Sequence, residues 1–177
     1  MSAQNDAVAR AAQVRLMIFD VDGVLTDGSL HFGPDGEVMK TFNVLDGHGM
    51  KLLQAGGTKT AIISARQSPI VLRRAADLGI AHVMQGIHDK AVAFEELLLE
   101  TGVAQAHCGF VGDDVIDLPI LMRVGFAASV PNGHAEVRSR VQYVTQAQGG
   151  RGAARELCDF ILRAQGRYDA AIAAYLP

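Results

Sequence analysis

Leu16-Met-Ile-Phe-Asp20-Val-Asp22-Gly23-Val-Leu-Thr26-Asp27 joins an apolar run to two closely spaced aspartates and a glycine. Residues 14–19 are largely apolar or branched and lack glycine and proline, which predicts a short buried strand. Side chains two positions apart share one face of a strand, so Asp20 and Asp22 emerge together at its carboxyl end. Gly23 permits the tight turn that follows. Because ligands bind at the carboxyl ends of strands in open α/β sheets, this pair is a candidate site.

The composition is that of a soluble globular protein, with 177 residues of which 49% are apolar and 20% charged. We expect one domain over 1–177, with an N-terminal extension at 1–13, a hairpin at 29–42 and a C-terminal tail at 165–177. The net charge of −3 gives no reason to expect nucleic acid or an anionic membrane as a partner. No segment approaches the ~20 apolar residues of a membrane span, and residues 1–13 lack the apolar stretch of a signal peptide. Two cysteines are too few for a disulfide framework, so we expect a cytoplasmic protein.

Strand and helix patterns alternate along the rest of the chain. A dense turn signal at 33–36 predicts the 29–42 hairpin directly after the first strand. Further strands are predicted at 59–63, 82–85, 109–112, 126–130 and 143–145. Helices are predicted at 68–78, 89–101, 118–123 and 153–164, and at 46–54 with Asp46 as the N-cap. This alternation predicts an α/β fold with a doubly wound, mostly parallel sheet.

Acidic and hydroxyl side chains follow three of the predicted strands: Asp20 and Asp22, then Ser64, then Asp113, Asp114 and Asp117. If these strands are parallel neighbours, their ends meet at one edge of the sheet. Two unit charges about 4 Å apart repel by about 4 kcal/mol at an effective dielectric of about 20. Several carboxylates therefore need a cation in order to converge, and oxygen ligands in an open site favour Mg²⁺. The simpler alternative, helix capping, stays open for Asp114 and Asp117 but does not explain two aspartates at the first turn.

Lys90 opens a predicted helix, where its charge is unfavourable to the helix dipole. Its ammonium can reach the same edge of the sheet. Together with Ser64 and the backbone N–H groups of the loops, it supplies the donors that a phosphate requires. Taken singly, Lys90 is equally well explained as a solvated surface lysine, and Ser64 as a capping or turn residue.

Four motifs stand in a fixed order: Asp20-Val-Asp22-Gly23, Ser64, Lys90 and Gly112-Asp113-Asp114-Val-Ile-Asp117. In this order the chain resembles the haloacid dehalogenase-like phosphotransferases. The resemblance implies a Rossmann-like fold in which Asp20 is the nucleophile and forms an aspartyl-phosphate. It implies that Asp22 protonates the leaving alcohol and then activates the hydrolytic water, with Ser64 and Lys90 completing the catalytic set. It also implies a Mg²⁺ ion held by the Asp20 carboxylate, the Asp22 main-chain carbonyl and Asp113.

Many members of this family carry a cap domain, for which this chain has no room. The stretch from Asp27 to Asp46 accommodates only the hairpin, and the stretch from Ser64 to Lys90 only one helix and one strand. A site without a cap needs another screen, either a large substrate or a neighbouring subunit. Because open hairpin edges tend to pair, we predict a homo-oligomer assembled through 29–42. The alternative is a solvated hairpin on a monomer.

Three longer segments, 20–28, 42–47 and 149–156, narrow the resemblance. With the capless length, they are similar to the phosphatases that hydrolyse 3-deoxy-D-manno-octulosonate 8-phosphate on the route to lipopolysaccharide. That likeness implies a homotetramer whose C-terminal tail can reach a neighbouring active site. It also implies a sugar-acid site lined by Asn43, Val44, Leu45, Asp46, Gly47, Lys51, Arg66 and Arg74. Arg151, between two glycines, is a further candidate, since arginines suit a substrate that carries both carboxylate and phosphate.

Three other functions stay open. A phosphatase for a nine-carbon, sialic-acid-type sugar 9-phosphate would use the same chemistry. A phospho-receiver domain also gathers carboxylates, Mg²⁺ and lysine on a parallel sheet, but it takes its phosphoryl aspartate from the third strand, where 82–85 offers none. A non-catalytic interaction protein would keep the fold, although no motif position is lost here. The simpler interpretation of the three arginines is a solvated surface or a helix lead-in.

Overall fold

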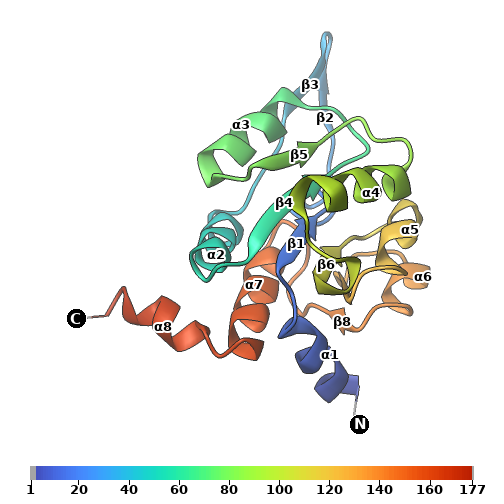
Figure 1. The fold of residues 1–177 in the computed structure, drawn as a ribbon. Helices are drawn as coiled ribbons and strands as arrows, with labels where there is room; N and C mark the ends of the chain where they lie inside the picture. Colours follow the sequence, from blue (N-terminus) through green and yellow to red (C-terminus); the bar gives the residue numbers. More distant parts are fainter. Residues whose placement is uncertain (1–2, 177) are drawn as a thin grey trace.

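A six-stranded parallel sheet forms the centre of the computed structural model, which describes residues 3–176 (Figure 1). Its strands are β1 (Leu16–Phe19), β4 (Lys59–Ile63), β5 (His82–Met84), β6 (Cys108–Val111), β7 (Phe126–Ser129) and β8 (Tyr143–Val144). The strand order is β5-β4-β1-β6-β7-β8, and each adjacent pair is parallel. The predicted doubly wound parallel sheet is therefore confirmed.

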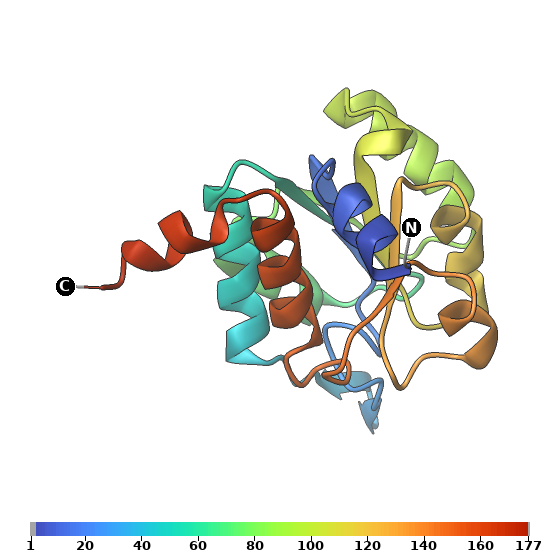
Figure 2. The same cartoon turned by 90° about the horizontal axis from the view of Figure 1, so that it is seen from below.

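Two layers of helices cover the faces of this sheet (Figure 2). One face is covered by α1 (Ala3–Ala11), α2 (Val44–Ala55), α3 (Pro69–Leu78) and α7 (Ala153–Ala164). The other is covered by α4 (Lys90–Thr101), α5 (Leu118–Leu121) and α6 (Ala135–Arg138). β1 serves both cores because its side chains alternate: Met17 and Phe19 pack in the first core, Leu16 and Ile18 in the second. The remaining helical elements are the 3₁₀ turns η1 (Gln105–His107) and η2 (Val115–Asp117) and the C-terminal α8 (Tyr168–Ala173).

A two-stranded antiparallel hairpin projects away from the sheet after β1 (Figure 1). Its strands are β2 (His31–Gly33) and β3 (Gly36–Met39), as the turn signal predicted. Between β1 and β4 the chain holds only this hairpin and α2, and between β4 and α4 only α3 and β5. The predicted absence of a cap domain is confirmed, so the carboxyl edge of the sheet is left open within one chain.

Three short helices, α1, α6 and α8, were not predicted, and one cap was assigned wrongly. α1 and α8 lie in the segments expected to be an extension and a tail. α1 packs through the small side chains of Ala7 and Ala11, which give a weak apolar pattern. α2 begins at Val44, and its N-cap is Asn43, whose side chain accepts a hydrogen bond from the N–H of Leu45, in place of the predicted Asp46. Within residues 3–176 no helix combines the length and apolar character needed to cross a membrane.

Candidate active site

The carboxyl ends of three adjacent strands meet around a small open cavity. β4, β1 and β6 are neighbours in the sheet, so the loops that follow them reach the same edge. The cavity measures about 150 Å³ and is lined by Asp20, Asp22, Ser64, Ala65, Arg66, Asp113, Asp114 and Ile116. The structure thus brings together predicted residues that lie more than ninety positions apart in the chain.

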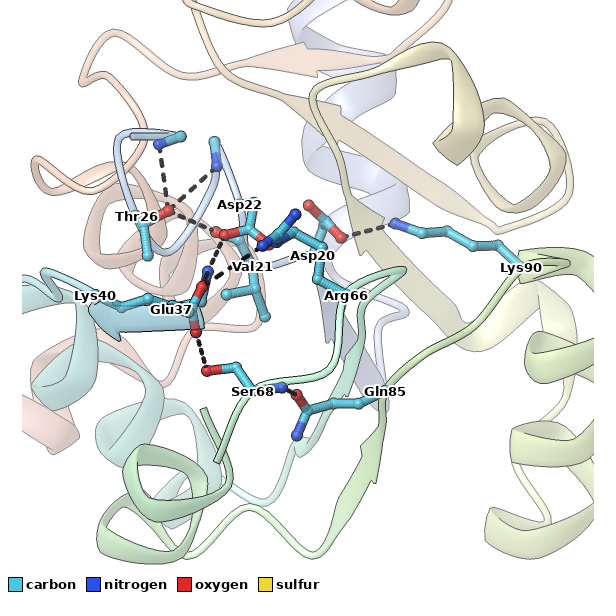
Figure 3. A network of polar contacts seen from close by, with 12 residues as sticks. Asp20, Val21, Asp22, Thr26, Glu37, Lys40, Arg66, Ser68, Gln85 and Lys90 are labelled. Atoms are coloured by element: carbon cyan, nitrogen blue, oxygen red, sulfur yellow. Dashed lines mark hydrogen bonds and ion pairs between the residues drawn. The ribbon is translucent and has the colours of Figure 1, made fainter. Parts of the chain in front are cut away.

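Lys90 is buried between two carboxylates at this edge, that of Asp20, which Figure 3 shows, and that of Asp117. Its Nζ donates to Asp20 Oδ1 at 2.7 Å and also to Asp117 Oδ1. The second oxygen of Asp117 accepts the backbone N–H groups of Asp113 and Asp114, at 2.9 and 3.1 Å. Asp117 therefore anchors both the ammonium and the loop after β6. The exposed Asp114 has another role, because its side chain accepts from the Val115 N–H and caps η2.

Burial and neighbouring carboxylates make ionisation of Asp20 and Asp113 unfavourable. Burial raises the pKa of Asp20 to about 8, against the lowering effect of Lys90 and with a further increase from Asp117. Burial also raises the pKa of Asp113 to about 7, and the nearby Asp117 and Asp114 add to it. Burial lowers the pKa of Lys90, but Asp20 and Asp117 outweigh that effect and raise it above its ordinary value. One ammonium therefore faces three carboxylates and does not balance their charge.

A hard dication fits this charge imbalance. One oxygen from each of Asp20, Asp113 and Asp117 lies within 4.8 Å of the others. Carboxylate oxygens are the ligands that Mg²⁺ prefers, and a positive ion between them would stabilise their ionised forms. Because Asp117 is engaged by Lys90 and two backbone N–H groups, Asp20 and Asp113 are the carboxylates best placed to hold such an ion.

Gly23 allows the loop after β1 to pass directly against Asp113. Its φ is +94°, and a Cβ added there would lie 2.0 Å from Asp113 Oδ2. Thr26 closes the same loop, since its hydroxyl accepts from the N–H of Gly23 and Gly28 and donates to the Val21 carbonyl (Figure 3). The loop that carries Asp20 and Asp22 is therefore held from within and has no space for a side chain at Gly23.

The hairpin supplies two site residues that the sequence reasoning missed. Lys40, just after β3, pairs with Asp22 and lies 3.0 Å from Glu37 (Figure 3). Arg66, a predicted substrate residue, lies 3.9 Å from both Asp22 and Glu37 and faces the ring of Phe32. The only sequence signal was a Glu and a Lys three positions apart, a pattern that solvated strands also show. The role of Lys40 and Glu37 depends on how the hairpin packs against the loop that carries Asp22. The local sequence pattern does not predict that packing.

A glycine-rich loop at 146–152 packs against the loop that carries the aspartates. Asn132 links the two, because its side chain donates to the Gly23 carbonyl at 2.9 Å and accepts from the Gly149 N–H at 2.8 Å. The Gly150 N–H donates to the Val24 carbonyl at 2.9 Å. Arg151 follows with an exposed side chain 3.7 Å from Asp27. The structure thus places Arg151 on a loop held against the aspartate loop, outside the residues that line the cavity, with its guanidinium open to solvent.

The other predicted substrate residues lie on or near α2 and α3, outside the lining of the cavity around Asp20. Arg74 donates to the Asn43 carbonyl at 3.3 Å, faces the ring of Phe42 and packs against Gly47. The same region exposes the predicted residues Val44, Leu45 and Lys51. Within one chain, the structure does not bring this group to the catalytic cavity.

Asp46 is buried and connects two helices. Its carboxylate accepts the N–H of Gly152 at 3.3 Å and that of Arg155 at 2.8 Å, at the start of α7. Burial raises the pKa of Asp46, although these backbone hydrogen bonds act against the increase. Asp46 therefore caps a helix more than a hundred residues away, where sequence spacing had suggested that it caps its own helix.

Comparison with known proteins agrees with this geometry. The model of the haloacid dehalogenase-like hydrolase family matches residues 71–157. The 3-deoxy-D-manno-octulosonate 8-phosphate phosphatase KdsC of Escherichia coli K12 is 44% identical over 166 residues, which cover 94% of this chain and 88% of that protein. The chain belongs to the haloacid dehalogenase-like hydrolase family and is a phosphatase within it.

Two solved structures extend the similarity to the whole fold. A probable YrbI family phosphatase from Pseudomonas syringae is 49% identical, with a TM-score of 0.95 and 98% of each chain covered. The 3-deoxy-D-manno-octulosonate 8-phosphate phosphatase of Moraxella catarrhalis is 42% identical, with a TM-score of 0.94, covering 97% of this chain and 98% of that one. The Moraxella structure is a complex with a magnesium ion, a phosphate ion and a molecule of 3-deoxy-D-manno-octulosonate (KDO).

Proposed function

We propose that this chain is a Mg²⁺-dependent phosphatase that releases phosphate from 3-deoxy-D-manno-octulosonate 8-phosphate and yields KDO for lipopolysaccharide synthesis. The observation that carries the proposal is the Asp20–Lys90 pair, 2.7 Å apart and buried beside Asp22, Ser64 and Asp113. The choice of substrate is supported by relatives that are 42–44% identical and match almost the full chain. Their names state this phosphatase activity.

The residues around the cavity fit a two-step transfer. Asp20 attacks the phosphorus atom, the bond to the sugar oxygen breaks, and Asp22 gives that oxygen its proton. Asp22 then takes a proton from water, which attacks the same phosphorus, and the bond to Asp20 breaks as phosphate forms. Lys90 and Ser64 bind the phosphoryl oxygens throughout. Mg²⁺, held by Asp20, Asp113 and the Asp22 main-chain carbonyl, would supply positive charge that neutralises the phosphate as the carboxylate approaches.

We assign the sugar acid to the open side of the cavity. Arg66 lines the cavity, and Arg151 lies on the glycine-rich loop that packs against the aspartate loop, so we propose both arginines as binders of the substrate carboxylate. The residues Asn43, Val44, Leu45, Gly47, Lys51 and Arg74 form a second group on α2 and α3, which a neighbouring subunit would bring to the substrate. We assign Asp46 to this group as a support, because its carboxylate is occupied by α7.

Assembly as a cytoplasmic homotetramer completes the proposal. The hairpin exposes Leu30, Phe32, Val38 and Met39, apolar side chains suited to contact with another copy of the chain. Both cysteines are free thiols and buried, which suits a reducing compartment. The C-terminal α8 extends from the body of the molecule (Figures 1 and 2), and we propose that the tail reaches a neighbouring chain of the tetramer.

Phosphate release from a panel of sugar-acid phosphates tests the proposal. With Mg²⁺ we expect kcat/KM to be highest for the eight-carbon 8-phosphate and to disappear when Mg²⁺ is chelated. Asp20→Asn removes the nucleophile and should abolish turnover. Preference for a nine-carbon 9-phosphate would reassign the substrate. Stable phosphorylation without turnover would support a receiver domain, and Mg²⁺-dependent turnover by Asp20→Asn would refute the mechanism.

A further inference from the structure

Lys40 is a buried cation to which the two-step scheme gives no role. Its side chain is 1% exposed, and its Nζ contacts Asp22 Oδ1 and lies 3.0 Å from Glu37 Oε1 (Figure 3). A buried ammonium is costly unless it is paired and hydrogen-bonded. The two carboxylates meet that need, so the hairpin places a fixed charged donor on the proposed acid/base residue.

Glu37 is itself held from a third element. Its Oε2 accepts from the Ser68 hydroxyl at the start of α3, and the Ser68 N–H donates to Gln85 Oε1 at 2.7 Å (Figure 3). The polar chain therefore runs from the end of β5 through the α3 terminus to the hairpin, and ends at Asp22. Each link joins a different segment of the chain, which gives Lys40 a defined position relative to the sheet.

We propose that Lys40, held by Glu37, is a positioning residue that fixes the Asp22 carboxylate for proton transfer; this inference rests on the proposed function. Lys40 binds Oδ1 of Asp22, whereas Arg66 Nε lies 3.9 Å from Oδ2, beyond hydrogen-bond distance. Oδ2 is therefore the oxygen that exchanges a proton with the leaving alcohol and then with water. Lys40 keeps its own protons in both steps.

Two phosphate esters distinguish positioning of Asp22 from a general structural effect. The sugar 8-phosphate expels an alcohol that needs a proton, whereas 4-nitrophenyl phosphate expels a stable phenolate that does not. The ratio kcat/KM reports only the reaction steps up to and including transfer of the phosphoryl group to Asp20. Hydrolysis of the aspartyl-phosphate comes later and does not affect this ratio. For Lys40→Met we expect kcat/KM to fall on the order of 100-fold for the sugar ester and less than about threefold for the nitrophenyl ester. An equal fall for both esters would overturn the proposal.

A double-mutant cycle tests whether Lys40 acts through Asp22. Asp22→Asn removes the proton donor, so adding Lys40→Met to it should change kcat/KM for the sugar ester by less than about threefold. Full additivity of the two losses would show that Lys40 acts independently of Asp22 and would overturn the positioning role. Lys59→Met is the matched control, because Lys59 is an exposed lysine at the amino end of β4 and should leave both esters unaffected.

Glu37→Gln keeps the test decisive if Lys40→Met does not fold. Gln keeps the side-chain shape but weakens the contact with Lys40. We therefore expect a smaller decrease in kcat/KM, confined to the sugar ester. An equal decrease for both esters contradicts the proposal. A wild-type protein that hydrolyses neither ester refutes the proposed function. An active wild type with no ester-selective loss in these variants refutes the positioning role alone.

Discussion

Asp20 and Asp117 share one ammonium but serve different purposes, because different groups donate to them. Asp117 accepts from Lys90 with one oxygen and from two backbone N–H groups with the other, so its charge is well solvated by the protein. Asp20 has the Lys90 contact against a large burial cost, and its pKa is raised to about 8. A cation at the other oxygen of Asp20 would stabilise the ionised form of this carboxylate. The ionised form is the one that acts as a nucleophile and as a metal ligand.

These pKa shifts predict that the metal-free protein loses stability as the pH rises. Asp20 and Asp113, with pKa values of about 8 and about 7, hold protons in the folded state that their unfolded forms release near pH 4. The folded state therefore binds more protons between these limits, and the unfolding free energy falls with increasing pH. Lys90 stays protonated over this range because its pKa is raised. In EDTA, we expect Tm to fall by at least about 5 °C between pH 5.5 and 8.5.

Substitution of the two aspartates is the control for this effect. Asp20→Asn together with Asp113→Asn should flatten most of the pH dependence, leaving the part that comes from the buried Asp46. Saturating Mg²⁺ should raise the wild-type Tm most at high pH, where both carboxylates are ionised. A Tm that rises with pH in EDTA, measured by differential scanning calorimetry, would contradict the charge imbalance inferred for the cluster.

For helices, strands and loops, the sequence patterns predicted the features that neighbouring residues determine. They missed the contacts that depend on how distant segments pack together. The strands of the sheet and the residues at their carboxyl ends were predictable, because each motif adjoins an apolar run. Lys40 could not be assigned to the site, since only the packing of the hairpin turns it toward Asp22. Asp46 was placed at the wrong helix terminus for a related reason: the N–H groups it accepts belong to α7, far along the chain.

The loop at 146–152 gives a prediction at this scale. A Cβ at Gly149 would lie 1.8 Å from the Gly23 carbonyl oxygen, which is backbone and has no rotamer to adjust. Gly149→Ala must therefore displace the loop that carries Asp20 and Asp22. Since a misplacement of about 1 Å can reduce turnover on the order of 100-fold, we expect a kcat loss of that size in steady-state phosphate release.

Gly102→Ala is the matched control for the glycine loop. Gly102 has φ +65° and no atom within 4 Å of an added Cβ, so alanine there incurs only the left-handed backbone penalty, about 1–2 kcal/mol. It lies at the far end of α4 from Lys90. We expect a lower Tm with unchanged kcat. Similar kcat values for the two alanine variants would show that the loop does not position the aspartates.

For the whole molecule, the open cavity and the exposed hairpin follow from the same feature, the absence of a cap. The residues of α2 and α3 lie outside the cavity lining within one chain, while the hairpin leaves Phe32 and Val38 61% and 62% exposed. Association through this surface would cover apolar area and close the site at the same time. It would also couple assembly to catalysis, because Lys40 and Glu37 belong to the segment that would be covered.

Assembly through the hairpin predicts that one surface charge changes both mass and turnover. Val38→Asp places a carboxylate in the proposed interface, where symmetry sets like charges against one another. By light scattering after size exclusion at micromolar concentration, we expect the wild type at four times the chain mass and the variant at a smaller mass. Turnover of the sugar 8-phosphate should fall together with the mass, because the separated chain leaves its site open.

Leu99→Asp is the control, since Leu99 is equally apolar and 86% exposed but lies on α4, and its variant should keep the wild-type mass. A monomeric wild type, or a Val38→Asp protein of unchanged mass, would rule out this interface and require the substrate alone to screen the aspartyl-phosphate.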